Sequence, residues 1–297
     1  MLKHQTINLW LLNDMVNNFE FYLTAKYKPE NAFLLAKLAK LIYQPEEEIS
    51  QHVVNWRASE FSYITTPTPV EAYDTQALIV ANADLIVVAF RGSESRTDWK
   101  NNLDFVLIEG YGGRVDESQG RVHRGFSHAL DSVWGQVKRT IERYQNQGQT
   151  LWFTGHSLGG ALATLAVSRL VLAEDKPVGG LYTYGSPRVG DRVFAQNFNN
   201  QFKDQNFRVV NNQDIVPRLP PRQMGYSHAG TFLYFSDSLT ITDDLYWWIK
   251  LLDTYPMTEA TVEQRLSQGL AGVEDHGIAL YQEHLARDIQ INPFLIY

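Results

Sequence analysis

The chain has 297 residues, of which 44% are hydrophobic and 20% are charged, and its formal net charge is −7. This length suits one large domain or two small ones. The acidic balance argues against nucleic acid as a partner, because phosphate binding needs clustered lysine and arginine side chains. The sequence contains no cysteine, which excludes disulfides and thiolate metal sites.

The N-terminal region lacks the pattern of a signal peptide. Its apolar stretch at 9–12 is interrupted by Asn13 and Asp14, which makes it too short for the hydrophobic part of a secretory signal. No run approaches the roughly 18 apolar residues that a membrane-spanning helix needs. We therefore expect a soluble protein, with the cytoplasm favoured; secretion would require a leader that precedes this sequence.

The first half of the chain predicts two helices, a hairpin and a third helix. Apolar residues recur at helical spacing over 29–43, and a second short helix is predicted from Pro45. Apolar runs at 75–81 and 85–90 flank an Asn82-Ala83-Asp84 turn, which predicts a buried hairpin. A further helix is predicted over 126–144.

From residue 151 onward, predicted strands and helices alternate. Strands are predicted at 151–154, 181–184, 207–210 and 231–235, and helices at 158–173 and 193–202. Such alternation implies parallel strands joined by crossover helices, while the early hairpin adds antiparallel pairing. We expect a single α/β domain over 1–297, with a mixed, mostly parallel central sheet flanked by helices.

The pentapeptide Gly155-His156-Ser157-Leu158-Gly159 matches G-x-S-x-G. It follows a predicted strand and opens an alanine-rich helix, the setting of a nucleophile elbow, where a sharp turn projects the serine from the sheet edge. Glycines two residues before and after Ser157 avoid collisions in such a turn. The alternative is a glycine-rich strand–helix turn with an incidental serine. We predict that Ser157 is a nucleophile.

A serine nucleophile needs a base, normally a histidine oriented by a carboxylate. Among eight histidines, His156 adjoins the nucleophile, so its side chain must leave the turn in another direction. His276 lies in a predicted loop before a helix, C-terminal to the nucleophile and to the predicted strands. This position agrees with the Ser, Asp, His order of α/β-hydrolases. We predict His276 as the base, although a lone histidine is more often structural.

The acid should follow a strand between these two residues. Asp214 lies after the predicted strand 207–210, at the edge where α/β proteins build their sites. The rivals are Asp191, Asp204, Asp237 and Asp275. We predict Asp214 as the acid.

The elbow, extended through Gly160 and Ala161-Leu162-Ala163, resembles that of the class 3 lipases, the fungal-type triacylglycerol lipase family. Further segments in the order of that family are Phe90-Arg91-Gly92-Ser93, Val122-His123-Arg124-Gly125-Phe126, Tyr184-Gly185-Ser186-Pro187-Arg188-Val189-Gly190 and Asp214-Ile215-Val216-Pro217. The resemblance implies an α/β-hydrolase fold with Ser157, Asp214 and His276 as the triad. It also implies an oxyanion hole made by Leu158 N–H and by Ser93, although Ser93 could instead cap the next helix.

The family carries a short lid after this serine, which corresponds here to about 94–106. Trp99 and Leu103 match its apolar face, whereas Arg96 and Lys100 stand where the fungal lipases place aliphatic residues. The apolar stripe is therefore narrow, which argues against strong activation at an oil–water interface. The stretch 240–272 is rich in large apolar groups; it could form a second cap or a membrane-touching surface, or it could pack on the core.

These patterns predict a serine ester hydrolase, and most specifically a lipase that acts through an acyl-enzyme. The expected partner is a lipid or small ester, with transient contact to a membrane or lipid interface; no metal or organic cofactor is needed. The alternatives within this chemistry are phospholipase A1 and feruloyl- or carboxylesterase, between which fold cannot choose. The alternative from another class is a non-catalytic lipid- or ester-binding protein.

Overall fold

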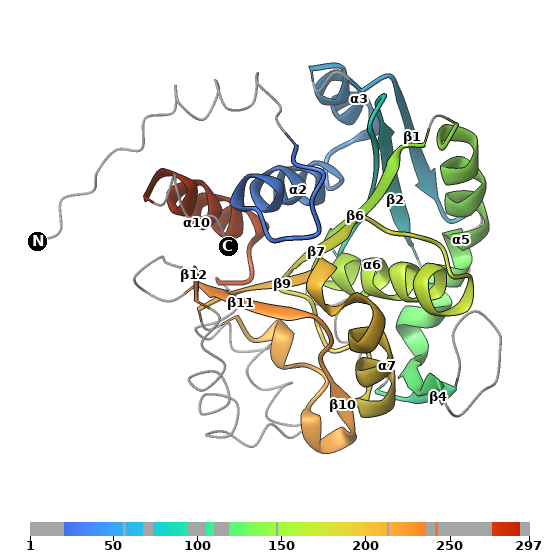
Figure 1. Cartoon of the computed structure of the whole chain (residues 1–297), viewed down its shortest axis with the longest axis vertical. Coiled ribbons are helices and arrows are strands. Elements are labelled where there is room, and N and C mark those ends of the chain that lie inside the picture. The colour runs from blue at the N-terminus through green and yellow to red at the C-terminus, as the bar shows by residue number, and fades with distance from the viewer. Residues whose placement is uncertain are drawn as a thin grey trace, which may run out of the picture.

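An eight-stranded twisted sheet forms the centre of the described part of the computed structural model (Figure 1). The structure describes residues 21–55, 58–67, 74–93, 105–109, 119–146, 148–212, 214–235, 241–242 and 275–291. In spatial order, the strands are β1 (Glu60–Thr65), β2 (Gln76–Ala81), β3 (Leu85–Phe90), β6 (Thr150–His156), β7 (Gly180–Tyr184), β9 (Asn206–Asn211), β11 (Thr231–Phe235) and β12 (Ile241–Thr242).

The middle of this sheet is parallel and its edges are antiparallel. Strands β3, β6, β7, β9 and β11 pair in parallel, while β1–β2, β2–β3 and β11–β12 pair antiparallel. The β2–β3 hairpin turns at Asn82, whose Oδ1 accepts hydrogen bonds from the backbone N–H groups of Asp84 and Leu85; asparagine often closes turns in this way. The predicted mixed, mostly parallel sheet is confirmed.

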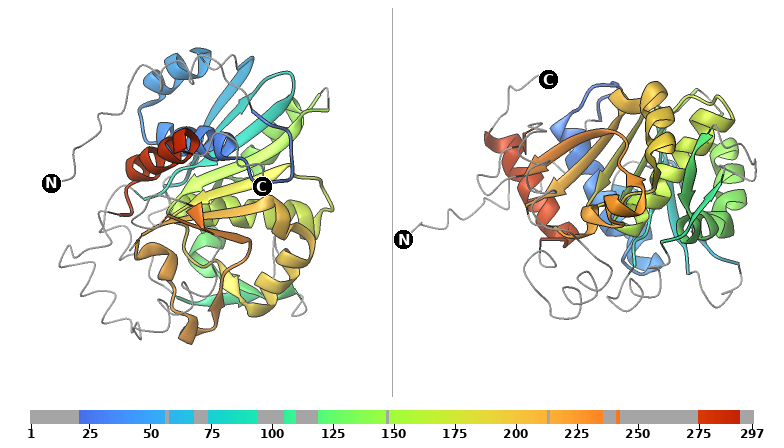
Figure 2. Two further views of the ribbon diagram at one scale, coloured as in Figure 1. Left: turned by 60° about the vertical axis from the view of Figure 1, so that its left-hand side comes forward. Right: turned by 90° about the horizontal axis from the view of Figure 1, so that it is seen from below.

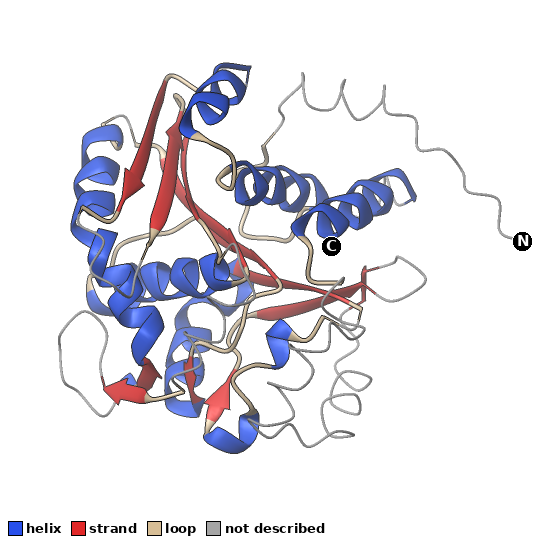
Figure 3. Ribbon diagram, turned by 180° about the vertical axis from the view of Figure 1, so that it is seen from behind, coloured by secondary structure: helices blue, strands red, loops and turns tan. Residues whose placement is uncertain are grey.

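Helices cover both faces of the sheet (Figures 2 and 3). One face carries α2 and α10, which pack against each other, and the other carries α5, α6 and α7. Helix α3 contacts β1 and contributes to the same core as α2 and α10. The bounds of the helices are α2 (Pro29–Leu41), α3 (Glu46–Asn55), α5 (Arg124–Tyr144), α6 (Leu158–Ser168), α7 (Arg192–Phe202) and α10 (Ile278–Ile291).

Each face of the sheet has its own apolar core. Ile79 and Val88 lie in the core with α5 and α6, whereas Leu78 and Val87 lie in the core with α2 and α10. Successive side chains of a strand point to opposite faces, and here both faces are covered. This explains why the central strands are continuous apolar runs.

A second, antiparallel sheet lies next to α7. Its strands, in spatial order, are β10 (Tyr226–Ser227), β8 (Gly190–Asp191), β5 (Arg121–His123) and β4 (Leu107–Glu109). Single 3₁₀ turns occur at Lys203–Gln205, Val216–Arg218 and Arg222–Met224. The predicted helix over 158–173 is confirmed in extent: α6 covers Leu158–Ser168, and a π-helical segment continues it over Arg169–Ala173.

Two predicted segments fall largely outside the described residues. Of the predicted lid at 94–106, only residues 105–106 are described, so Trp99 and Leu103 lie outside. Of the predicted cap at 240–272, only β12 is described. None of the described helices combines the length and the apolar character that a bilayer span requires.

Candidate active site

Ser157 occupies the turn between β6 and α6, and its backbone adopts an unusual conformation. Its φ is 58° and its ψ is −128°, a region that residues other than glycine rarely adopt and that costs about 1–3 kcal/mol. The turn is held by a 2.9 Å hydrogen bond from Ser157 N–H to the carbonyl of Tyr184. The surrounding structure therefore places this serine at the carboxyl edge of β6.

The glycines around Ser157 are required by close backbone approach. A Cβ on Gly155 would lie 2.2 Å from the backbone of Gly159, and a Cβ on Gly159 would lie 2.1 Å from the carbonyl oxygen of Phe90. Both distances are far below van der Waals contact. The spacing of the pentapeptide thus reflects a turn in which helix α6 begins directly against β6 and the end of β3.

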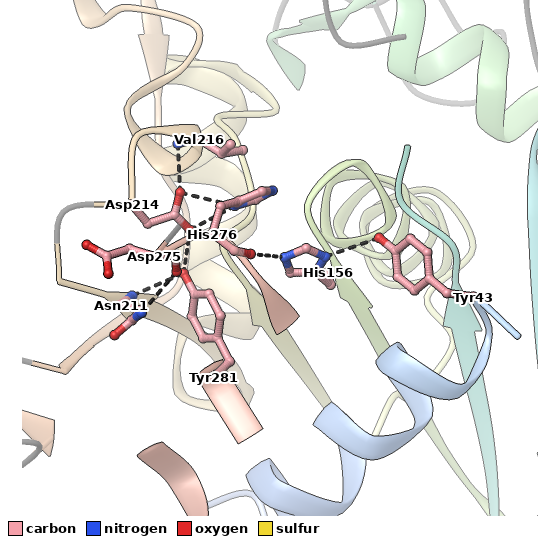
Figure 4. Close-up of polar contacts among 8 residues, drawn as sticks. All are labelled: Tyr43, His156, Asn211, Asp214, Val216, Asp275, His276 and Tyr281. Atoms are coloured by element: carbon pink, nitrogen blue, oxygen red, sulfur yellow. Dashed lines mark hydrogen bonds and ion pairs between the residues drawn. The ribbon is translucent and has the colours of Figure 1, made fainter. Parts of the chain in front are cut away.

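Asp214 and His276 form a direct pair near this turn (Figure 4). Nδ1 of His276 lies 2.9 Å from Oδ2 and 3.1 Å from Oδ1 of Asp214, whose side chain is fully buried. An ionised carboxylate only accepts hydrogen bonds, so Nδ1 of His276 carries the proton. In the neutral imidazole, Nε2 is then the nitrogen that can accept a proton.

Two further groups fix the carboxylate of Asp214. Oδ1 accepts a 2.9 Å hydrogen bond from the backbone N–H of Val216, and Oδ2 accepts a 2.6 Å hydrogen bond from the hydroxyl of Tyr281. That hydroxyl in turn accepts a 3.0 Å bond from the N–H of Asn211, the last residue of β9. Burial and Asp214 both raise the pKa of Tyr281, so its hydroxyl stays protonated and donates.

The end of β7 connects the serine turn to the Asp–His pair. Gly185 follows Tyr184, which binds the Ser157 N–H, and has a φ of 58°. A Cβ on Gly185 would lie 2.6 Å from Oδ2 of Asp214 and 2.9 Å from Nδ1 of His276. The three residues predicted as a triad therefore lie at the same edge of the sheet.

The oxyanion candidates also lie at this edge. A Cβ on Gly92 would lie 2.7 Å from the carbonyl oxygen of His156 and 3.2 Å from Cβ of Ser157. The backbone that leads into Ser93 therefore lies against the serine turn. Leu158 is the first residue of α6, and a helix N-terminus presents unpaired N–H groups to a nearby negative charge.

The loop after Asp214 is tied to the segment after β7 by a buried arginine. Arg188 donates hydrogen bonds to the carbonyl oxygens of Arg218 and, over 2.8 Å, Pro220. Burial, together with neighbouring arginines, lowers the pKa of Arg188 to about 9, so it remains charged at neutral pH. His228 adds a 2.7 Å bond to the carbonyl of Pro217. These bonds hold the loop that carries Asp214.

The rival acids have other positions. The side chain of Asp191 accepts a bond from Phe194 N–H and so caps α7, and Asp204 lies in a 3₁₀ turn. Asp275 contributes its backbone carbonyl to Asn211, while Asp237 lies outside the described residues. Within the described ranges, no three acidic or histidine side chains are grouped so that they could hold a metal ion.

Sequence reasoning missed Tyr281 and Tyr43 and gave His156 no partner. Tyr281 lies on α10, five residues after His276, and Tyr43 follows α2. Both face the site through hydroxyls, and the helical pattern of the sequence marks neither of them. The side chain of His156 points toward the main chain of His276 and the hydroxyl of Tyr43 (Figure 4).

Known proteins with similar sequences are lipases and phospholipases. The family model of class 3 lipases matches residues 87–224. A secreted mono- and diacylglycerol lipase of Fusarium solani is 40% identical over 151 residues, which are 48% of this chain and 42% of that protein. Phospholipase A1-II 4 of Oryza sativa is 32% identical over 172 residues, which are 50% of this chain and 42% of that protein. The chain thus spans less than half the length of these relatives.

The solved structures agree on the fold. The structure of Rhizomucor miehei triacylglyceride lipase superimposes with a TM-score of 0.57 at 25% identity, covering 78% of this chain and 83% of that one. Together with the mostly parallel sheet flanked by helices, this match confirms the α/β-hydrolase fold.

Proposed function

Because the family model of class 3 lipases matches residues 87–224, we propose that the chain is a serine hydrolase of carboxylic esters, and within that class a lipase that cleaves acylglycerols. Ser157 acts as the nucleophile, His276 as the base and Asp214 as the acid that orients it. The strongest single support is the bond between Nδ1 of His276 and the buried carboxylate of Asp214, beside the strained turn of Ser157.

Acylation begins with proton transfer. Since Nδ1 of His276 is bonded to Asp214, Nε2 is the acceptor that takes the proton from Ser157 Oγ as this oxygen attacks the ester carbonyl carbon. The carbonyl oxygen becomes an oxyanion. Leu158 N–H and Ser93 stabilise it, and preorganised donors of this kind are usually the largest electrostatic contribution to such reactions.

The tetrahedral intermediate then collapses. The bond between the carbonyl carbon and the alcohol oxygen breaks, and Nε2 of His276 donates its proton to the leaving alcohol, which leaves the acyl group on Ser157. Water repeats the sequence: His276 takes a proton from water as the water oxygen attacks the acyl carbonyl carbon. The acyl–serine bond then breaks and His276 returns the proton to Ser157 Oγ, which leaves a carboxylic acid and free Ser157. Asp214 stays ionised and stabilises the imidazolium that forms twice per turnover.

We propose a lipid ester as the substrate class and a transient contact with a lipid interface. The Fusarium relative acts on mono- and diacylglycerols by its name, which favours acylglycerols. Phospholipase A1 is the second candidate, because a rice relative of nearly the same coverage carries that name. Feruloyl- and carboxylesterase activity are the further alternatives on the same scaffold.

A substrate panel tests the proposed reaction. The protein is assayed on p-nitrophenyl esters of increasing acyl length, on a triglyceride emulsion, and on phosphatidylcholine vesicles. We expect hydrolysis of the esters and of the emulsion. Release of the sn-1 fatty acid from phosphatidylcholine at a higher kcat/KM than from triglyceride would instead favour phospholipase A1.

A matched pair of serine variants gives this panel its control. Ser157→Ala should abolish turnover. Ser168→Ala removes another buried serine hydroxyl, which donates to the carbonyl of Leu165 at the end of α6, and should leave turnover near the wild-type level. Equal activity of Ser157→Ala and wild type would exclude the serine mechanism, and inactivity of the wild type on every substrate would favour a non-catalytic lipid-binding protein.

A further inference from the structure

His156 links three parts of the site through its two ring nitrogens (Figure 4). Its Nε2 lies 2.6 Å from the backbone carbonyl oxygen of His276, and its Nδ1 lies 3.1 Å from the hydroxyl of Tyr43. The rings of His156 and His276 are 4.5 Å apart. The residue before the nucleophile therefore contacts the main chain of the base.

The direction of these hydrogen bonds follows from the chemistry of the partners. A carbonyl oxygen only accepts, so Nε2 of His156 must carry the proton and donate to His276. Nδ1 is then the unprotonated nitrogen of a neutral ring, and it must accept from the Tyr43 hydroxyl. Hydrogen-bond donation therefore runs from the Tyr43 hydroxyl to His156, and from His156 to the carbonyl of His276.

Tyr43 also reaches the oxyanion loop. A Cβ on Gly92 would lie 2.2 Å from the Tyr43 hydroxyl oxygen, so this oxygen lies directly against the backbone that precedes Ser93. Burial raises the pKa of Tyr43, which keeps the hydroxyl protonated. The guanidinium of Arg91 lies over the Tyr43 ring, 5.7 Å from its centre, within the range of a cation–π contact.

From these contacts we propose that Tyr43 and His156 are positioning residues of the proposed ester hydrolysis, which fix the main chain of the base and the start of the oxyanion loop relative to the nucleophile. The inference rests on the proposed function. It assigns a role to Tyr43, which lies outside the 87–224 region matched by the family model. Neither residue touches the reacting atoms in this role.

The position of the base depends on such a tie. His276 precedes α10, and its side chain is anchored at one nitrogen by Asp214. The bond from His156 anchors its main chain as well. Two anchors, one on the backbone and one on the ring, fix where Nε2 of His276 points. A shift of about 1 Å in such a group can cost roughly 10²-fold in rate.

The neutral state of His156 belongs to this role. Burial and then the nearby His276 lower the pKa of His156 well below its usual range. Among the described residues, the rings that face it are those of Tyr43, His276 and Tyr281, none of which carries a carboxylate. A neutral ring donates to the His276 carbonyl without placing a positive charge 4.5 Å from the imidazolium that forms during turnover.

A double-mutant cycle tests whether the two residues act as one unit. The variants are Tyr43→Phe, His156→Leu and the double variant, assayed on a soluble p-nitrophenyl ester for kcat and KM separately. We expect a fall in kcat of about 10-fold for Tyr43→Phe and roughly 10²-fold for His156→Leu, with KM little changed. In the absence of His156, Tyr43→Phe should change kcat by less than about 2-fold.

Two companion variants separate positioning from packing. Tyr144→Phe also removes a buried tyrosine hydroxyl, which donates to the carbonyl of Phe61 over 2.9 Å, but it lies on α5 and should leave kcat unchanged. His156→Gln retains an N–H donor for the His276 carbonyl and should recover at least about 10-fold of the kcat lost in His156→Leu. A residue that only fills space would not be rescued in this way.

The outcomes separate this inference from the function on which it rests. Independent effects in the cycle, an unchanged kcat for Tyr43→Phe, or a change confined to KM would each overturn the positioning role. Wild-type turnover that Ser157→Ala abolishes would then still support ester hydrolysis. Turnover that survives Ser157→Ala in the same assay would remove the proposed function and this inference together.

Discussion

The hydroxyl of Tyr281 donates a 2.6 Å hydrogen bond to Oδ2 of Asp214, the same oxygen that lies 2.9 Å from Nδ1 of His276. Helix α10 therefore contacts the acid through Tyr281, which lies five residues after the base His276 in the sequence. The hydroxyl also accepts from the N–H of Asn211, so it joins the end of β9 to the carboxylate that follows it. This arrangement makes Tyr281 a third support of the Asp–His pair.

Replacing Tyr281 with phenylalanine should therefore affect both stability and turnover. The change leaves the buried N–H of Asn211 without its acceptor, which should cost about 1–3 kcal/mol of unfolding free energy. The carboxylate of Asp214 also loses one of its three fixed partners, so kcat should fall by roughly 10-fold. Urea unfolding and ester kinetics measure the two effects. A variant with wild-type kcat and lowered stability would leave Tyr281 a purely structural role.

Asp214→Asn is the direct test of the acid. The amide would favour the wrong tautomer of His276, and kcat should fall by about 10⁴-fold with near-native folding. Ser157→Ala and His276→Ala should each cost several orders of magnitude, because the three residues act as one unit. Asp237→Asn is the matched control for the sequence alternative. Loss of activity in Asp237→Asn, with Asp214→Asn active, would make the assignment wrong.

Ser93→Ala tests the proposed oxyanion hole. The substitution removes a hydroxyl and keeps the backbone donor, so the loss should be partial, at roughly 10²-fold in kcat, or about 2.7 kcal/mol. KM should change little, because the oxyanion exists only in the transition state and the intermediate. Steady-state kinetics on a soluble ester measure kcat and KM separately for this variant and the wild type. A rise in KM at constant kcat would instead make Ser93 a substrate-binding residue.

Acid should destabilise the fold through two histidines, His156 and His228. Burial, as the largest cause, lowers the pKa of both His156 and His228 well below its ordinary value, which is about 6.5 in an unfolded chain. Above that pH neither state binds these protons, and stability is unaffected. Below it only the unfolded state binds them, so each histidine removes about 1.4 kcal/mol per pH unit until its folded pKa is reached.

Urea unfolding at a series of pH values measures this dependence. Stability should be flat with respect to these groups above pH of about 7 and should fall below about 6.5. His156→Gln and His228→Gln should each reduce the slope by about one proton, while His284, whose pKa burial also lowers, contributes equally in all three proteins. An unchanged slope in both variants would contradict the account.

The lid predicted at about 94–106 leads to an expectation about how the protein responds to a lipid interface. Trp99 and Leu103 supply two large apolar groups, and transfer of apolar surface from water to lipid is favourable by about 25 cal/mol per Å². Arg96 and Lys100 narrow the apolar stripe of the predicted lid. We expect ready hydrolysis of soluble short or medium acyl esters and a modest rise on crossing the solubility limit. The double variant Arg96→Ile and Lys100→Ile should increase that rise and slow turnover of soluble ester.

Rate against substrate concentration through the solubility limit tests this for both proteins. A wild-type protein that is nearly silent on monomeric ester and abruptly active on emulsion would contradict it. The apolar stretch with Trp247 and Trp248 would then become the candidate lipid-facing surface.

The sheet could be predicted where its strands are long and buried on both faces. The apolar runs that became β2, β3, β6 and β7 were found within one or two residues, because continuous burial leaves a continuous apolar signal. The second sheet was missed, since strands of two or three residues such as Gly190–Asp191 show no alternation. Edge strand β1 was missed as well; its mixed burial pattern gives a weak signal.

Part of the candidate site could also be predicted from the sequence. Residues that follow parallel strands gather at one edge, and so the sequence could place Ser157 and Asp214 near each other. Tyr43 and Tyr281 could not be found, because the direction of their hydroxyls depends on how α2 and α10 dock on the sheet.

Covalent labelling with a fluorophosphonate probe tests the central claim most directly. The probe reacts with a serine only when a neighbouring base makes it nucleophilic. Mass spectrometry should find one equivalent of probe on the peptide that contains Ser157, with labelling abolished by Ser157→Ala, slowed by several orders of magnitude in His276→Ala, and retained in Ser168→Ala. Labelling of a different serine, or equal labelling rates for wild type and His276→Ala, would contradict a triad of Ser157, His276 and Asp214.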